Sequence, residues 1–234
     1  MAFYDPIAGR WDAIAGDRGG AFKRHVLNHR LLEQIGNARG LSILELGAGN
    51  GYFGRLLRPS PRRLVLSDAS AALLDIAFKR RPIPGAEYVL LDVGDSFPFA
   101  PGDFDLVLAT MIFNEVRTPA LSNAIRECAR VLRPEGRLLS TVLHPRFVHS
   151  LSRRGQLHPR HDGRGPLTMP GEEGLRLPVV RREAEEYEML LAESGFSFRT
   201  QDLAPTEKVL LEKRGPASLG KLPWALLFDA CRSP

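Results

Sequence analysis

The sequence predicts an α/β fold with a doubly wound, mostly parallel sheet. Short apolar runs suited to buried strands recur along the chain, and the segments between them carry apolar residues at a helical period. Several of these runs end close to an acidic residue, at Glu45, Asp68 and Asp92. This alternation is typical of β-α-β units, in which the carboxyl ends of the strands meet at one edge of the sheet and form the ligand site.

The composition indicates one substantial domain. The chain has 234 residues, 44% of them hydrophobic, which allows a sizeable core but leaves little room for a second full domain. Cys128 and Cys231 lie in apolar segments without metal-like spacing, so we expect reduced cysteines of an intracellular protein. The N-terminus lacks a secretory pattern, and no apolar run approaches membrane-spanning length. We therefore expect a soluble, cytoplasmic monomer or homodimer with no membrane partner.

The formal net charge of +5 has two interpretations. A basic surface is suited to nucleic acid, which is one possible partner. Arginine greatly exceeds lysine, however, and no arginine run is interleaved with the aromatic side chains that stack on bases. We therefore expect a solvated surface rather than a nucleic-acid partner.

Residues 1–40 predict a helical cap in front of the sheet. Tyr4 and Trp11 begin two similar six-residue segments, in which each aromatic residue is followed by an aspartate. Aromatic residues in this position serve either as packing anchors or as contacts to a ligand. The apolar residues of 22–35 then follow the period of an amphipathic helix.

The stretch 41–57 predicts a strand, a tight turn and a helix. An apolar run that contains Glu45 leads into three alternate glycines, Gly47, Gly49 and Gly51. Glycines let the backbone approach a ligand, and the first amides of a following helix lack intrahelical partners. The turn therefore suits a polar or anionic ligand, with Glu45 as an acceptor for an ammonium group or ribose hydroxyls. With one further glycine it also satisfies the dinucleotide-binding fingerprint, so the turn alone leaves the ligand open.

The next predicted strands carry acids at their ends. Asp68 follows the second strand and Asp92 the third, although an acid in such a place can also be a helix N-cap or an ordinary turn residue. A fourth strand is predicted at 104–109, a helix at 121–132 and a fifth strand at 137–143.

The order and spacing of these motifs resemble the class I S-adenosylmethionine-dependent methyltransferases. The resemblance rests on the motif from Glu45 to Gly51, the two strand-end acids, the Phe-Asp start of 104–109 and the Arg-Pro-Glu-Gly turn before 137–143. It implies a Rossmann-like fold with a seven-stranded sheet whose last strand, 224–228, is antiparallel. It also implies S-adenosylmethionine as the cofactor, released as S-adenosylhomocysteine.

The resemblance implies roles for individual residues. Asp68 would accept hydrogen bonds from the two ribose hydroxyls, Asp92 would accept from the adenine amino group, and Ala69 would pack against the adenine. The N-terminal aromatic pair would lie over the cofactor. The complete set of expected cofactor-binding residues is Tyr4, Trp11, Glu45, Gly47, Ala48, Gly49, Gly51, Asp68, Ala69, Asp92, Val93 and Thr110.

Residues 144–180 predict an insertion after the fifth strand with little regular structure, because prolines, glycines and arginines interrupt every pattern. We interpret it either as a basic substrate cap that meets an anionic group or as a solvated insertion. Its histidines have irregular spacing and no cysteine beside them, so no metal site is predicted. His144 is the candidate general base, unless Pro145 fixes it for backbone reasons alone. The candidate substrate-binding residues are Asn114, Glu115 and Arg146.

We therefore predict a methyltransferase that transfers a methyl group to a nitrogen, oxygen or carbon of a small-molecule acceptor by in-line displacement. The acceptor is either anionic or neutral. An RNA or protein methyltransferase of the same fold, and a cofactor-binding protein that transfers no methyl group, are the alternatives. The single predicted domain spans 1–234, with the helical cap at 1–40, the cofactor-binding core at 41–143, the substrate-cap insertion at 144–180 and the C-terminal helix and strands at 181–234.

Overall fold

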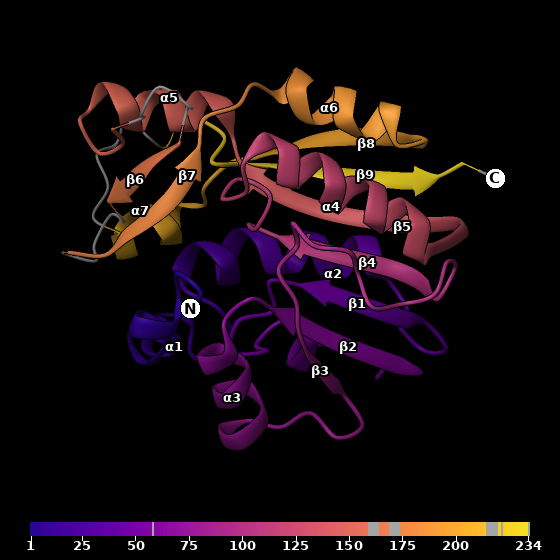
Figure 1. The fold of residues 1–234 in the computed structure, drawn as a ribbon. Helices are drawn as coiled ribbons and strands as arrows, with labels where there is room; N and C mark the ends of the chain where they lie inside the picture. Colours follow the sequence, from indigo (N-terminus) through magenta and orange to yellow (C-terminus); the bar gives the residue numbers. More distant parts are fainter. Residues whose placement is uncertain (58, 159–163, 169–173, 214–219, 221, 234) are drawn as a thin grey trace.

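The structure, a computed structural model, describes residues 1–57, 59–158, 164–168, 174–213, 220 and 222–233. Seven of the described strands form one sheet in the order β3-β2-β1-β4-β5-β9-β8 (Figure 1). Strands β1 to β5 are parallel to one another, whereas β9 is antiparallel to both β5 and β8. The predicted α/β class and the antiparallel last strand are confirmed. The strands are β1 (Ser42–Leu46), β2 (Arg63–Asp68), β3 (Glu87–Leu90), β4 (Phe104–Thr110), β5 (Leu132–Leu143), β8 (Phe196–Leu203) and β9 (Ala225–Arg232).

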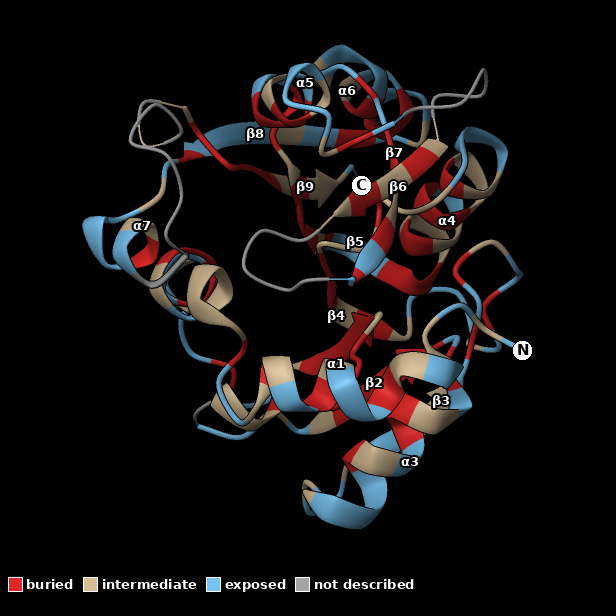
Figure 2. Cartoon of the chain, turned by 90° about the vertical axis from the view of Figure 1, so that its left-hand side faces the viewer, coloured by how far each residue is buried: buried red, intermediate tan, exposed pale blue. Residues whose placement is uncertain are grey.

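Helices cover both faces of this sheet, because successive strand residues point to opposite sides. Ile43 of β1 packs in a hydrophobic cluster with Leu31 of α2, whereas its neighbour Leu44 packs in a second cluster with Leu121 of α4 and Leu190 of α6. Figure 2 shows the buried residues concentrated in the central strands, while the outer sides of the helices are exposed. The α-helices are α1 (Ala8–Ala15), α2 (Asn28–Ile35), α3 (Ala71–Arg80), α4 (Thr118–Val131), α5 (Pro145–Arg153), α6 (Ala184–Glu193) and α7 (Glu207–Lys213).

The prediction of a helix directly after the glycine turn is wrong. Only a short 3-10 helix, η3 (Gly54–Leu56), follows the turn. Gly54 is a poor helix former, and a Cβ at this position would approach Ile83 and Leu66 to 3.0 Å, so close packing against the sheet requires glycine there. The amides of Ala48, Gly49 and Gly51 donate to Ser67, Asp68 and Ala48, so hydrogen bonds within the protein hold the turn.

The expectation of little regular structure in 144–180 is also wrong. The segment forms α5 and a two-stranded antiparallel hairpin of β6 (Arg164–Thr168) and β7 (Arg176–Val180). α5 exists because Phe147 and Leu151 lie one turn apart and bury the same face. The hairpin depends on pairing between two separate short segments, which local patterns do not reveal. Residues 159–163 and 169–173 of the predicted insertion lie outside the described residues.

The insertion and the N-terminal segment gather at the carboxyl ends of the parallel strands. Figure 1 shows α1, α5, β6 and β7 at the left of the sheet, the side to which the arrow of β1 points and from which the arrow of β9 points away. This edge is where doubly wound folds bind their ligands. No helix within the described ranges is long and apolar enough to cross a membrane.

Candidate functional site

A cavity of about 400 Å³ lies beside the glycine turn, and we call it the turn cavity. It collects residues from the N-terminal segment, the turn and the ends of several parallel strands. Two expected cofactor-binding residues, Glu45 and Gly51, do not line it. The expected residues that do line it are Tyr4, Trp11, Gly47, Ala48, Gly49, Asp68, Ala69, Asp92, Val93 and Thr110.

The turn is built from glycines with left-handed backbone geometry. Gly47 has φ +64° and Gly49 has φ +58°, a region that other residues rarely adopt. A Cβ on Gly47 would also approach Ile112 to 3.1 Å. Glycine is therefore required on both conformational and steric grounds, and the bare backbone forms one wall of the cavity.

Asp68 joins the end of β2 to this turn. Its Oδ2 accepts from the Gly49 backbone amide and its Oδ1 from the Ser70 backbone amide, both at 2.8 Å. Burial raises the pKa of Asp68, while these hydrogen bonds act against the rise. The alternative of a helix N-cap is wrong, because the Ser70 hydroxyl caps α3 by accepting from the Leu73 amide at 3.2 Å. Each carboxylate oxygen keeps a lone pair for a ligand.

Thr110 closes the same cavity at the end of β4. Its Oγ1 is buried and has no hydrogen-bond partner among the described residues. A buried hydroxyl without a partner is rare in folded proteins. Because Thr110 lines the turn cavity, a polar ligand there would satisfy it.

Glu45 behaves differently from the other strand-end acids. Its side chain is buried, it accepts from the Gly54 amide, and its Oε2 has no partner in the described part of the chain. Burial raises the pKa of Glu45 to about 8, against the opposing charges of Lys23 and Arg55. A contact between Glu45 and the cofactor stays a prediction.

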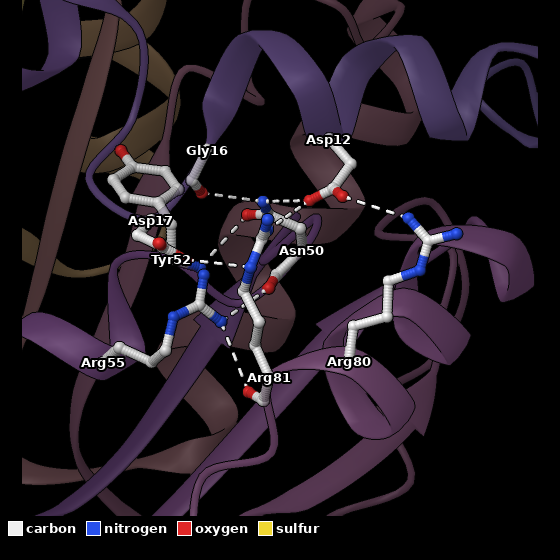
Figure 3. Close-up of polar contacts among 8 residues, drawn as sticks. All are labelled: Asp12, Gly16, Asp17, Asn50, Tyr52, Arg55, Arg80 and Arg81. Carbon is white, nitrogen blue, oxygen red and sulfur yellow. Dashed lines mark hydrogen bonds and ion pairs between the residues drawn. The ribbon is translucent and has the colours of Figure 1, made fainter.

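A polar cluster fixes α1 against the turn and the end of α3 (Figure 3). Asp12 accepts from the Asn50 side chain at 2.7 Å and also pairs with Arg80 and Arg81. The Asn50 amide also donates to the Gly16 carbonyl at 3.0 Å. Desolvation alone would raise the pKa of Asp12, but the Asn50 and Arg81 hydrogen bonds outweigh it and hold the pKa below its ordinary value. The cluster therefore holds the N-terminal cap over the site.

The N-terminal aromatic pair lies on the wall of the turn cavity. The rings of Tyr4 and Trp11 meet edge to face, with centroids 5.3 Å apart. The Tyr4 hydroxyl donates to Oε1 of Glu115 at 2.8 Å. Tyr4 thus links the cap to the segment that follows β4.

A second cavity of about 150 Å³ adjoins the first, and we call it the apolar cavity. Its walls are mainly aliphatic and aromatic side chains from α1, α5 and the β6–β7 hairpin, together with Trp224. Its charged or amide side chains are Lys23, Asn114 and Glu115. The two cavities have four residues in common, which we call the shared wall: Trp11, Lys23, Met111 and Glu115.

Lys23 has no counterpart among the residues expected from the sequence. It begins a π-helical turn, η2 (Lys23–Leu27), and turns of this kind are frequent at functional sites. Its Nζ lies 5.7 Å from the centre of the Trp11 ring and 5.2 Å from that of Tyr52. Burial lowers the pKa of Lys23, while Glu115, Glu45 and Asp68 oppose this change. In the sequence it looks like any lysine near a helix start, so no local signal identifies it.

The expected substrate-binding residues separate in the structure. Asn114 and Glu115 line the apolar cavity. The Asn114 side-chain oxygen accepts from the Leu143 amide at 3.3 Å, which fixes Asn114 against β5. Arg146 lines neither cavity. It lies on α5 in a surface groove, together with Arg153. Substrate binding by Arg146 stays a prediction without support from this geometry.

His144 lines neither cavity. It is the N-cap of α5, and its Nδ1 accepts from the Arg146 amide at 3.1 Å. Its Nε2 lies 3.2 Å from Asp202, to which it donates in this tautomer. Burial lowers the pKa of His144, and Asp202 opposes this shift. Both ring nitrogens are engaged, as expected for a histidine fixed before Pro145 for backbone reasons.

Comparison with known proteins agrees with this geometry. Residues 44–140 match the family model described as "Methyltransferase domain". A malonyl-[acyl-carrier protein] O-methyltransferase of Methylococcus capsulatus is 42% identical over 101 residues, which cover 41% of this chain and 35% of that protein. A demethylmenaquinone methyltransferase of Thermotoga maritima is 30% identical over 148 residues, or 62% of each chain. This chain thus spans about a third of the first relative and under two thirds of the second.

The fold has solved counterparts. The crystal structure of an S-adenosylmethionine dependent methyltransferase from Mesorhizobium loti superimposes with a TM-score of 0.69 at 20% identity, over 91% of this chain and 99% of that chain. The matched residues include the glycine turn and the strands β2, β3 and β4, whereas β8 and β9 lie beyond them. Residues 44–140 therefore match a methyltransferase domain, and the chain has the fold of solved S-adenosylmethionine-dependent methyltransferases.

Proposed function

We propose that this chain transfers a methyl group from S-adenosylmethionine in the turn cavity to a small molecule in the apolar cavity. The observation that carries the proposal is the shared wall, since ligands in the two cavities would lie next to each other across the same four side chains. Methyl transfer requires this proximity, and correct positioning supplies on the order of 7–11 kcal/mol of barrier lowering in well-oriented reactions.

The residues of the turn cavity fit the cofactor. The glycine backbone leaves room for a closely approaching ligand, Asp68 offers two carboxylate oxygens to ribose hydroxyls, and Thr110 has a buried hydroxyl that lacks a partner in the described chain. Asp92 lines the cavity and would accept from the adenine amino group. When bound, S-adenosylmethionine supplies a methyl group that its sulfonium charge has already activated. The protein then has to orient both ligands and exclude water.

The apolar cavity favours a largely apolar acceptor with a small polar group. Its aromatic and aliphatic walls disfavour a highly charged molecule, whereas the side chains of the shared wall would meet one polar group. The names of the two relatives, a malonyl-[acyl-carrier protein] O-methyltransferase and a demethylmenaquinone methyltransferase, support a small-molecule acceptor group over RNA. Arg146, Arg153 and Arg154 of the predicted cap lie in the outer groove, and Arg164 lines the turn cavity rather than the apolar cavity, so an anionic acceptor has less support.

Calorimetry with the purified protein tests the cofactor first. We expect S-adenosylmethionine and S-adenosylhomocysteine to release heat on binding and pyridine nucleotides to release none. The reverse result would exclude the proposal and favour the dinucleotide interpretation of the glycines.

Transfer is tested with radiolabelled cofactor and a whole-cell extract of the source organism, whose labelled products are separated into small molecules, RNA and protein. We expect a labelled low-molecular-weight product. Tight cofactor binding without any labelled product would favour a cofactor-binding protein that transfers no methyl group. Labelled RNA or protein would favour an RNA or protein methyltransferase.

A cytoplasmic location stays a prediction, with which the free cysteines Cys128 and Cys231 agree.

A further inference from the structure

Glu115 is the acidic residue of the shared wall. It lines both the turn cavity and the apolar cavity, so its carboxylate lies where the two proposed ligands would meet. One oxygen, Oε1, accepts from the Tyr4 hydroxyl at 2.8 Å. Within the described ranges, Oε2 has no hydrogen-bond donor. The residue is therefore held by one oxygen while the other is left for a ligand.

Lys23 complements Glu115 across the same wall. Its ammonium group lies over the rings of Trp11 and Tyr52 and lines both cavities. No ion pair joins Lys23 to Glu115 in the part of the chain that the structure describes, although their charges influence each other. A positive and a negative group thus face the same small volume without neutralising each other by direct contact.

We propose that Glu115 is the catalytic base of this protein and that the acceptor carries a hydroxyl group, as in an apolar phenol or enol, with Lys23 facing the acceptor oxygen. This inference rests on the proposed function. An amine acceptor gains positive charge as it takes the methyl group and would be disfavoured beside Lys23, whereas an oxygen that develops negative charge would be stabilised by it.

The reaction balances without any further reactant. The hydroxyl proton passes to a carboxylate oxygen of Glu115, and the acceptor oxygen uses its electron pair to bond the methyl carbon. The carbon–sulfur bond breaks with its electron pair on sulfur, which leaves a neutral thioether. The carboxylate and the sulfonium lose their opposite charges together, so the net charge of the site does not change.

The electrostatics of the site suit this role. Burial raises the pKa of Glu115 to about 8, which is near the value that a general base needs at neutral pH. The charged or titratable groups that face it are Tyr4, Lys23, Asp68 and Arg164, from four different segments; Tyr4, Lys23 and Arg164 lower the pKa, while Asp68 raises it. A cationic cofactor in the turn cavity would lower it further and favour the ionised base.

The test compares the wild type with E115Q and with the surface control E185Q. Calorimetry with S-adenosylmethionine comes first, because absence of binding to the wild type would exclude the proposed function itself. Rates are then measured with radiolabelled cofactor and 2-naphthol from mildly acidic to alkaline pH. We expect the wild-type rate to rise with pH to a plateau, and E115Q to bind cofactor while losing about 10²-fold or more in rate at neutral pH.

A second measurement does not depend on turnover. 4-Nitrophenol is bound in the presence of S-adenosylhomocysteine, and its ionisation is followed by absorbance. In E115Q the bound phenol should ionise at lower pH than in the wild type, because Lys23 remains and the opposing carboxylate charge is gone. E185Q should match the wild type.

The Y4F variant provides a second test of the proposal if E115Q does not fold. It removes a hydrogen bond that lowers the pKa of Glu115, so the rising part of the pH profile should move to higher pH. The inference is overturned if E115Q binds cofactor and keeps the wild-type rate, pH profile and phenol ionisation. It is also overturned if the cofactor-bound wild type methylates an amine probe and neither phenol.

Discussion

Two acids that the sequence places at neighbouring strand ends have different roles. Asp68 lines the turn cavity and uses both oxygens to accept backbone amides, whereas Glu45 is buried away from the cavity, and one of its oxygens has no partner among the described residues. Spacing predicted that both acids lie near the glycine turn. It did not separate them, because their difference depends on which side of β1 and β2 each side chain occupies.

Asp68→Asn should weaken cofactor binding about 10- to 100-fold, since a hydrogen bond to a charged group contributes about 1.5–3 kcal/mol. The asparagine amide would also face a backbone N–H that the carboxylate now accepts. Calorimetry with S-adenosylhomocysteine measures the loss, with exposed Asp95→Asn as the control. Equal affinity in both variants would remove Asp68 from the cofactor site.

Glu45→Gln should stabilise the fold at alkaline pH. The pKa of Glu45 is about 8 in the folded chain and ordinarily 4.5, so between these values only the unfolded state releases the proton. The cost of burying the acid therefore increases as the pH rises from 4.5 to 8 and is absent below 4.5. Thermal melts of E45Q and the wild type across this range should diverge with rising pH, and parallel curves would contradict the expected shift.

At the scale of elements, the N-terminal cap depends on the cluster around Asp12. D12A removes the acceptor for Asn50 and Arg81, and we expect a loss of about 1–3 kcal/mol with weaker cofactor binding. Because the folded pKa of Asp12 is lowered, this stabilisation is present above the ordinary value of 3.8 and is lost as the pH falls through the folded pKa. Urea titrations of D12A and the wild type at neutral and acidic pH should therefore converge only in acid.

His144 at the start of α5 can be tested as a cap or a base. If it is a cap, H144A loses about 1 kcal/mol, or roughly 2–4 °C in Tm, and H144N recovers most of it. Turnover of H144N should then stay close to that of the wild type. A large loss of turnover in both variants, with normal cofactor affinity, would restore the general-base prediction.

Elements with long local patterns were the predictable ones. Strand β4 follows from an uninterrupted apolar run and helix α4 from apolar residues at a helical period. The β6–β7 hairpin was missed because its strands are five residues each and depend on tertiary contacts, which include their pairing with each other and the hydrogen bond from the Val180 amide to the Asn114 carbonyl. The 3-10 helix η3 was missed because the closeness of Gly54 to Leu66 and Ile83 is a tertiary property.

On the scale of the whole molecule, the order of the strands explains why sequence spacing located more of the proposed cofactor site than of the proposed acceptor site. Apart from Tyr4 and Trp11, the expected cofactor residues that line the turn cavity lie within 47–110, in the segments that end or follow β1, β2, β3 and β4, which are neighbours in the sheet, so sequence spacing carries over into spatial proximity. The acceptor site joins residues as distant as Lys23 and Trp224. No spacing rule relates them, since only the folded cap and insertion bring them together.

The shared wall makes the two ligands thermodynamic partners. If a molecule bound in one cavity beside Trp11 and Lys23 changes the affinity of the other cavity for its ligand, that ligand changes the affinity of the first cavity by the same factor. The coupling free energy is a property of the two ligands together. Loss of the sulfonium charge after each turnover alters that coupling. The coupling between the spent cofactor and the methylated product therefore differs from the coupling between the two substrates.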